Sequence, residues 1–112
     1  MSLKKHRLST EEFSSTIRKG VNYNSEFFYL KILMNDQGLL KVGVAVSKNL
    51  GKKPTQRNYY KRVLRHLLRE ASLNWQTPYN IILTAKDNIK NVKFNELKQD
   101  AIKLLQKTEL YK

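Results

Sequence analysis

The stretch KNLGKKPTQRNYYKRVLRHLLR, residues 48–69, decides how the rest of the chain is interpreted. Each residue of an α-helix advances by about 100°, so the polar residues after position 56 fall on one continuous arc. That arc holds Arg57, Asn58, Lys61, Arg62, Arg65 and Arg69. The opposite arc, the side that a helix buries against a core, holds Tyr60, Val63, Leu64, Leu67, Leu68 and Ala71. The stretch therefore predicts a helix with one basic face and one apolar face.

The basic face has no acidic residues to balance it. A short basic run is usually a solvated surface, but such surfaces normally mix both charges. Here no Asp or Glu occurs between positions 37 and 69. Like charges four residues apart, as in Arg57–Lys61 and Lys61–Arg65, repel by a few tenths of a kcal/mol each. We therefore expect a polyanion to supply the missing counter-charge.

Composition narrows the class of protein. The chain has 112 residues, enough for one domain with a modest core, and a net charge of +13. That charge favours binding to nucleic acid or to an anionic membrane surface. The membrane is the weaker alternative, because the core requires the apolar side of the basic helix. The sequence contains no cysteine, no apolar run long enough to span a membrane and no signal peptide, so we expect a cytoplasmic protein.

The remaining elements follow from caps and periodicity. Residues 1–8 form a basic arm with no periodicity. Such an arm can contact phosphate, but we expect a frayed, partly mobile terminus. Ser9 and Glu12 form a capping box at the start of a helix that Gly20 ends with a left-handed C-cap. Strands are predicted at residues 21–23, 27–34, 40–47 and 79–85, and a last helix at 93–107. The order αβββαβα predicts a single-domain α/β sandwich with helices covering a sheet.

Two strand faces leave a functional question open. Phe27, Tyr29 and Lys31 share one face of the second strand. On the third strand the residues 41, 43, 45 and 47 share a face with small side chains. Close packing against a helix explains that face, and so does a shallow groove for an extended ligand.

No residue pattern predicts a catalytic site. His6 and His66 are isolated, and metal sites need several clustered ligands, so both are interpreted as surface residues. The carboxylates form no pair spaced for acid–base chemistry, and the four glycines are too dispersed for a phosphate loop. The sequence therefore predicts a binding protein, with no metal or cofactor of its own.

The basic stretch also resembles a known signature. Ser47-Lys48-Asn49-Leu50-Gly51, followed by Arg57-Asn58-x-x-Lys61-Arg62-x-x-Arg65, is similar to the S-K-K-x-G and R-N-R-x-K-R motifs of the bacterial ribonuclease P protein subunit. This chain has Asn49 in place of the usual Lys and Tyr59 in place of the second Arg of R-N-R. It also has one extra residue between Gly51 and Arg57. The resemblance extends from about residue 3 to residue 110.

The resemblance implies a function for the whole chain, 1–112, as one RNA-binding domain. In this family an RNA subunit carries the catalytic site, uses Mg²⁺ and removes the 5′ leader of precursor tRNA, and the protein assists it. The family's RNA-binding motif corresponds to Lys48, Lys52, Lys53, Arg57, Asn58, Lys61, Arg62 and Arg65, and Arg69 extends it. The leader-binding cleft corresponds to Phe13, Ile17, Tyr29 and Lys31.

The resemblance also implies that the basic helix lies in a left-handed crossover, although geometry alone favours the right-handed form. Two other classes remain as alternatives. One is a non-catalytic ribosomal or RNA-chaperone-like protein, which the charge explains but the motif spacing does not. The other is a small nuclease that acts without an RNA subunit.

Overall fold

The computed structural model describes residues 4–111, and it contains the predicted elements in the predicted order. The three α-helices are α1 (Thr10–Lys19), α2 (Pro54–Glu70) and α3 (Phe94–Gln106). The four strands are β1 (Val21–Asn24), β2 (Phe28–Met34), β3 (Lys41–Val46) and β4 (Tyr79–Ala85). Two short 3-10 turns, η1 (Lys4–His6) and η2 (Asp87–Ile89), complete the described chain. The predicted single-domain αβββαβα sandwich is therefore confirmed.

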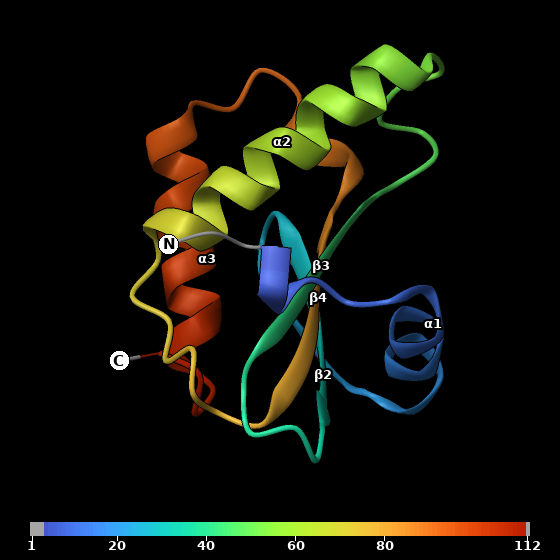
Figure 1. Cartoon of the computed structure of the whole chain (residues 1–112). Coiled ribbons are helices and arrows are strands. Elements are labelled where there is room, and N and C mark those ends of the chain that lie inside the picture. The colour runs from blue at the N-terminus through green and yellow to red at the C-terminus, as the bar shows by residue number, and fades with distance from the viewer. Residues whose placement is uncertain (1–3, 112) are drawn as a thin grey trace.

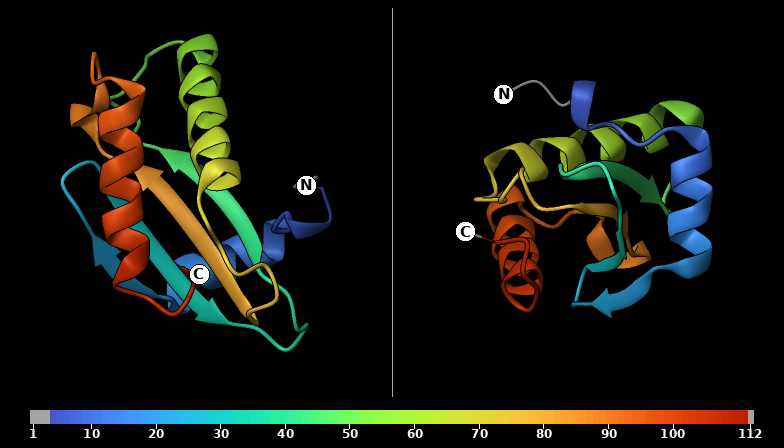
Figure 2. Two further views of the ribbon diagram at one scale, coloured as in Figure 1. Left: turned by 90° about the vertical axis from the view of Figure 1, so that its left-hand side faces the viewer. Right: turned by 60° about the horizontal axis from the view of Figure 1, so that its bottom comes forward.

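The strands form one mixed sheet in the order β1-β2-β4-β3. The β1–β2 and β2–β4 pairs are antiparallel, whereas β3 and β4 are parallel and α2 connects them. Helix α1 covers one face of the sheet, and α2 and α3 lie on the other face (Figure 1). In the left panel of Figure 2, seen from the α2 side with β3 and β4 pointing upward, β4 lies to the left of β3. The crossover is therefore left-handed, as the resemblance implied.

The core lies between the sheet and the two helices α2 and α3. The predicted apolar arc of α2 supplies Leu64, Leu67 and Leu68, each at most 2% exposed. Side chains from one face of β2 and β4 meet them, and α3 closes the core with residues such as Leu104. The basic arc of α2 consequently faces outward, so the helix orientation predicted from the sequence is confirmed.

Helix α1 begins as predicted but ends differently. Ser9 Oγ accepts the Glu12 N–H, and Glu12 Oε1 accepts the Ser9 N–H, which completes the capping box. The left-handed C-cap predicted at Gly20 is wrong, because its φ is −70° and the chain passes directly into β1. A Cβ at Gly20 would lie 2.6 Å from the Thr16 carbonyl oxygen. Glycine is needed here for close backbone approach.

The described part of the N-terminal arm is packed, which corrects two predictions. His6 is 5% exposed, its Nδ1 lies 2.6 Å from the Leu40 carbonyl oxygen and its ring meets Trp75 edge-on. The Leu8 N–H donates to the Val42 carbonyl, beside the outer edge of β3. The frayed arm and the surface His6 are therefore wrong for residues 4–8, and residues 1–3 lie outside the described chain.

The small-sided face of β3 is partly explained by close packing. Ideal Cβ geometry at Gly43 would bring that atom within 2.9–3.0 Å of the Phe13 ring and 3.1 Å of Leu8 Cδ1. Any side chain at Gly43 would therefore force the Phe13 ring and the Leu8 side chain to shift. Glycine at this position lets Leu8 and Phe13 lie directly on the sheet.

An ion pair fastens α1 to β3 and makes stability depend on pH. Burial acts to raise the pKa of Glu12, but hydrogen bonds from Lys41 and Ser9 outweigh it and lower the pKa to about 2. The pKa of Glu12 is lower in the folded state than its unfolded value near 4.5, so the charged side chain stabilises the fold at pH values above 4.5. This contribution is lost as the pH falls towards 2.

We therefore expect Glu12→Gln to lower the free energy of unfolding at pH 7 by about 1–3 kcal/mol. The difference from the parent protein should narrow as pH falls from 5 to 3, measured by urea denaturation. Glu11→Gln is the matched control, because Glu11 is exposed in the same helical turn. A deficit that stays constant from pH 7 to pH 3 would contradict the role of the Glu12 charge.

Candidate nucleic-acid interface

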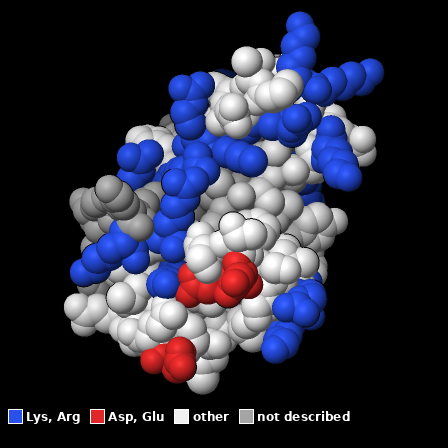
Figure 3. Space-filling view, turned by 45° about the vertical axis from the view of Figure 1, so that its right-hand side comes forward, with Lys and Arg blue, Asp and Glu red and all other residues white. Residues whose placement is uncertain are grey.

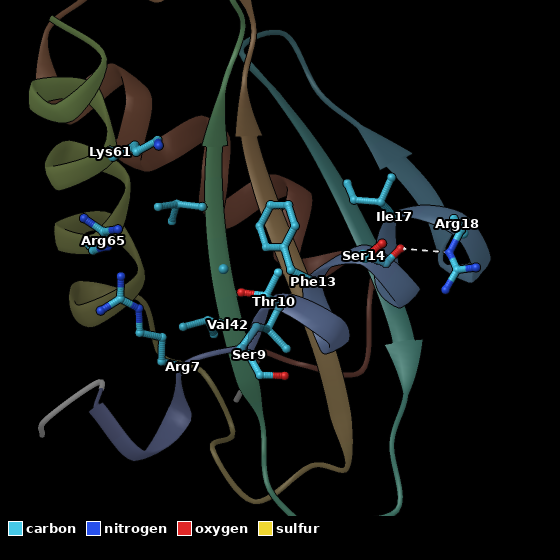
Figure 4. A pocket seen from close by; sticks show the side chains of 13 residues that line it. Arg7, Ser9, Thr10, Phe13, Ser14, Ile17, Arg18, Val42, Lys61 and Arg65 are labelled. Atoms are coloured by element: carbon cyan, nitrogen blue, oxygen red, sulfur yellow. Dashed lines mark hydrogen bonds between the residues drawn. The ribbon is translucent and has the colours of Figure 1, made fainter. Parts of the chain in front are cut away.

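A cleft of about 910 Å³ opens between α1, the edge strand β3 and α2. In Figure 4, Phe13 and Ile17 project from α1 on one side of it, while Lys61 and Arg65 project from α2 on the other. Val42, Gly43 and Val44 of β3 line the cleft between the two helices. One wall is therefore largely apolar and the other is basic.

The basic wall concentrates positive charge, and none of the described residues that line the cleft is a carboxylate. Arg7, from the N-terminal segment that runs along β3, lies next to Arg65 (Figure 4). Partial burial lowers the pKa of Arg65, and the positive charges of Arg7 and Arg69 lower it further. Like charges held this close repel each other, and a bound anion would relieve the repulsion.

The surface shows the same separation of charge. On the face shown in Figure 3, Lys and Arg side chains form a broad band over the upper and left parts, with a further group at the lower right, whereas Asp and Glu form two small patches in the lower part. Glu12, which adjoins the cleft residue Phe13 in the sequence, is already paired with Lys41 at 2.8 Å. The net charge of +13 is thus distributed unevenly, and the cleft opens onto the positive part.

Two of the four predicted leader-cleft residues line the cleft, and the other two lie on the sheet surface next to it. Phe13 and Ile17 line the cleft, and Ile17 is 40% exposed. Lys31 donates from Nζ to the Ile17 carbonyl (2.7 Å), so it secures the end of α1.

Tyr29 lies one pleat further along the same face of the sheet. Gly43, Ile82 and Lys31 lie side by side across β3, β4 and β2. Tyr29 lies two residues before Lys31 on β2 and pairs with Thr84 of β4. Tyr29 is 44% exposed, and Lys86 Nζ lies 4.6 Å from its ring centroid. Tyr29 and Lys31 are therefore outside the lining of the cleft but on the surface that continues from it.

The predicted RNA-binding residues divide into three groups. Lys61 and Arg65 point into the cleft. Arg57 donates from Nη1 to the carbonyls of Gly51 and Lys52, at 3.1 and 3.3 Å, so it also holds the loop before α2. The remaining residues are exposed and free to meet a large ligand: Lys48, Lys52, Lys53, Asn58, Arg62 and Arg69.

Sequence reasoning missed Arg7 and Lys86 as parts of this surface. Arg7 sits in the segment that we expected to be frayed, so its position beside Arg65 depended on the packing of His6 and Leu8. Leu8 was a usable signal, because an apolar residue directly before the Ser9 N-cap packs against the helix and fixes the direction in which the chain enters it.

The described residues, 4–111, offer no constellation for metal-based chemistry. Within this range no group of three or more His, Cys, Asp or Glu side chains is placed to hold a metal ion. His66 meets Glu70 at 3.4 Å on the surface of α2 and has no further acidic neighbour in an ion pair among these residues. Over the same range, none of the helices is both long and apolar enough to cross a membrane.

Comparisons with known proteins agree with one another. The sequence model of the family Ribonuclease P matches residues 2–109. The "Ribonuclease P protein component" of Thermoanaerobacter sp. (strain X514) is 32% identical over 100 residues, which cover 89% of this chain and 85% of that protein. The corresponding protein of Caldanaerobacter subterraneus subsp. tengcongensis is 31% identical over 102 residues, covering 91% and 87%.

Solved structures of this family have the same fold. The RNase P protein from Thermotoga maritima superimposes with a TM-score of 0.79 at 22% identity, covering 92% of this chain and 97% of that one. The RNase P protein of Staphylococcus aureus gives a TM-score of 0.76 at 20% identity, covering 96% and 98%. With the family model matching nearly the whole chain, this protein belongs to the ribonuclease P protein family.

Proposed function

We propose that this protein is the protein component of ribonuclease P and has two RNA-binding surfaces. The exposed basic face of α2 binds the catalytic RNA subunit. The cleft and the sheet surface beyond it bind the 5′ leader of precursor tRNA. The protein thereby assists endonucleolytic removal of the leader, and it acts in the cytoplasm.

The observation that supports this proposal is that an apolar wall and a basic wall face each other across the cleft. A single RNA strand presents phosphates along one side and unstacked bases along the other. Lys61 and Arg65 suit the phosphates, whereas Phe13 and Ile17 suit the bases. A duplex does not expose its bases in this way, so the cleft favours an unpaired segment such as a leader.

In this proposal the chemistry belongs to the RNA subunit. That subunit uses Mg²⁺ to cleave the phosphodiester bond, and the protein binds no cofactor itself. Basic side chains of the protein lower the repulsion between two RNAs that must approach each other. The alternative of a ribosomal or RNA-chaperone-like protein shares this charge but does not require an apolar wall beside the basic one.

Arg65→Ala tests the electrostatic part of the proposal. Each phosphate contact that is lost should make the slope of log affinity against log salt shallower by about 0.7–0.9. We expect that change, together with weaker binding, when the variant is titrated against precursor tRNA with a single-stranded 5′ leader at several KCl concentrations. Lys103→Ala on α3 is the charge-matched control and should leave the slope almost unchanged. Equal slopes for the parent and for alanine variants across the whole basic face would reject the proposal.

A further inference from the structure

A second, shallower hollow lies on the other flank of α2 from the cleft. It has a volume of about 400 Å³, and Leu50, Thr55, Gln56, Tyr59, Tyr60, Lys90 and Asn91 line it. On a helix, Tyr59 lies about 160° around the axis from Lys61 and about 60° from Arg62. The hollow is therefore separate from the cleft, and the exposed part of the basic face lies between the two.

Tyr59 is the unusual residue of this hollow. It is 54% exposed, although the adjacent Tyr60 packs against the core. The two rings meet edge to face, with centroids 5.2 Å apart and an interplanar angle of 73°. This contact fixes the direction of the Tyr59 ring while much of it remains open to solvent. The fold does not need an exposed aromatic side chain here, because Leu64, Leu67 and Leu68 already supply the apolar side of α2.

The surroundings of Tyr59 are polar and basic. Lys90 and Asn91 come from the loop after η2, and both are exposed. Asn91 adopts a left-handed conformation (φ 64°), which turns the chain beside the hollow. No carboxylate is among the lining residues, and the neighbouring Asp87 accepts a hydrogen bond from Asn49 Nδ2 at 3.4 Å.

We propose that Tyr59 forms a base-stacking site for an unpaired nucleotide of the RNA that binds the basic face of α2. This inference rests on the proposed function and adds a contact of a different kind. Arg62, one helical turn further on, and Lys90 across the hollow meet the flanking phosphates. An aromatic ring beside basic side chains is the combination that binds unpaired bases irrespective of their identity.

The stacking contact predicts a specific pattern in RNA titrations. Stacking releases no counterions, so Tyr59→Ala should weaken binding without changing its salt dependence. Against a bacterial ribonuclease P RNA at several KCl concentrations, we expect about 5–150-fold weaker binding. Tyr59→Phe retains the ring and should bind as the parent does. Tyr59→Leu retains apolar bulk without a ring and should lose affinity as Tyr59→Ala does.

Arg62→Ala is the matched comparison on the same flank. It should weaken binding and also make the salt slope shallower by about 0.7–0.9. Because Tyr59 is exposed, its variants should melt within about 3 °C of the parent, which separates lost binding from lost folding.

Three outcomes would overturn the stacking site while leaving the proposed function intact. These are unchanged affinity in Tyr59→Ala, parent-like affinity in Tyr59→Leu, and a salt slope in Tyr59→Ala that falls as it does in Arg62→Ala. A parent protein that fails to bind the ribonuclease P RNA would instead overturn the proposed function.

Discussion

Leu67→Ala is expected to lower the free energy of unfolding by about 2–5 kcal/mol. Leu67 is 2% exposed in the middle of the apolar arc of α2, where its side chain packs against the core. Truncation removes this packing and leaves a cavity, and a small domain has only about 5–15 kcal/mol of stability in total. Urea or thermal denaturation at neutral pH measures the change.

Arg62→Ala provides the opposite result on the same helix. Its side chain is exposed, so we expect its denaturation midpoint to match the parent while its RNA affinity falls. Leu67→Ala should bind RNA normally under conditions where it remains folded. A parent-like midpoint for Leu67→Ala would mean that the orientation of α2 is wrong.

Tyr29→Ala is expected to weaken binding of leader-bearing precursor tRNA to the assembled enzyme by up to about 10–100-fold. Tyr29 is 44% exposed on the sheet surface that continues from the cleft, with Lys86 beside its ring. Loss of one stacked base accounts for this range, and the nearby cation can contact the phosphate of the same nucleotide. Affinity for leaderless tRNA and assembly with the catalytic RNA should change little.

Two comparisons sharpen the Tyr29 result. Met34→Ala, at the far end of β2 and 67% exposed, removes a similar exposed apolar side chain and should bind leader-bearing substrate normally. Arg62→Ala should impair assembly and leave the preference for a leader. If Tyr29→Ala weakens leader-bearing and leaderless tRNA equally, the leader surface is assigned to the wrong residues while the basic face of α2 is unaffected.

Local patterns were enough to predict the elements of this fold. The division of α2 into two arcs and the Ser9–Glu12 capping box depend on residues close together in sequence, and both are present. The end of α1 was not predictable in the same way. Gly20 was interpreted through the common C-cap rule, whereas the close approach of the Thr16 carbonyl, and then of the Ile32 backbone on β2, is what requires glycine.

The residues of the cleft could likewise be predicted only in part from the sequence. The sequence identified Phe13, Ile17, Lys61 and Arg65 as separate candidates, and the folded chain brings them to one place. Arg7 joined them only because His6 and Leu8 are buried against β3, contacts that span 34 residues or more. The leader-binding role of Phe13, Ile17, Tyr29 and Lys31 remains a prediction.

The most direct test is the Mg²⁺ requirement of a bacterial ribonuclease P RNA processing precursor tRNA, with and without this protein. We predict that the protein lowers the Mg²⁺ concentration needed for cleavage at the leader junction, and that it cleaves nothing without the RNA. An unchanged Mg²⁺ requirement would contradict the account. So would cleavage of precursor tRNA by the protein alone, which would establish a nuclease that acts without an RNA subunit.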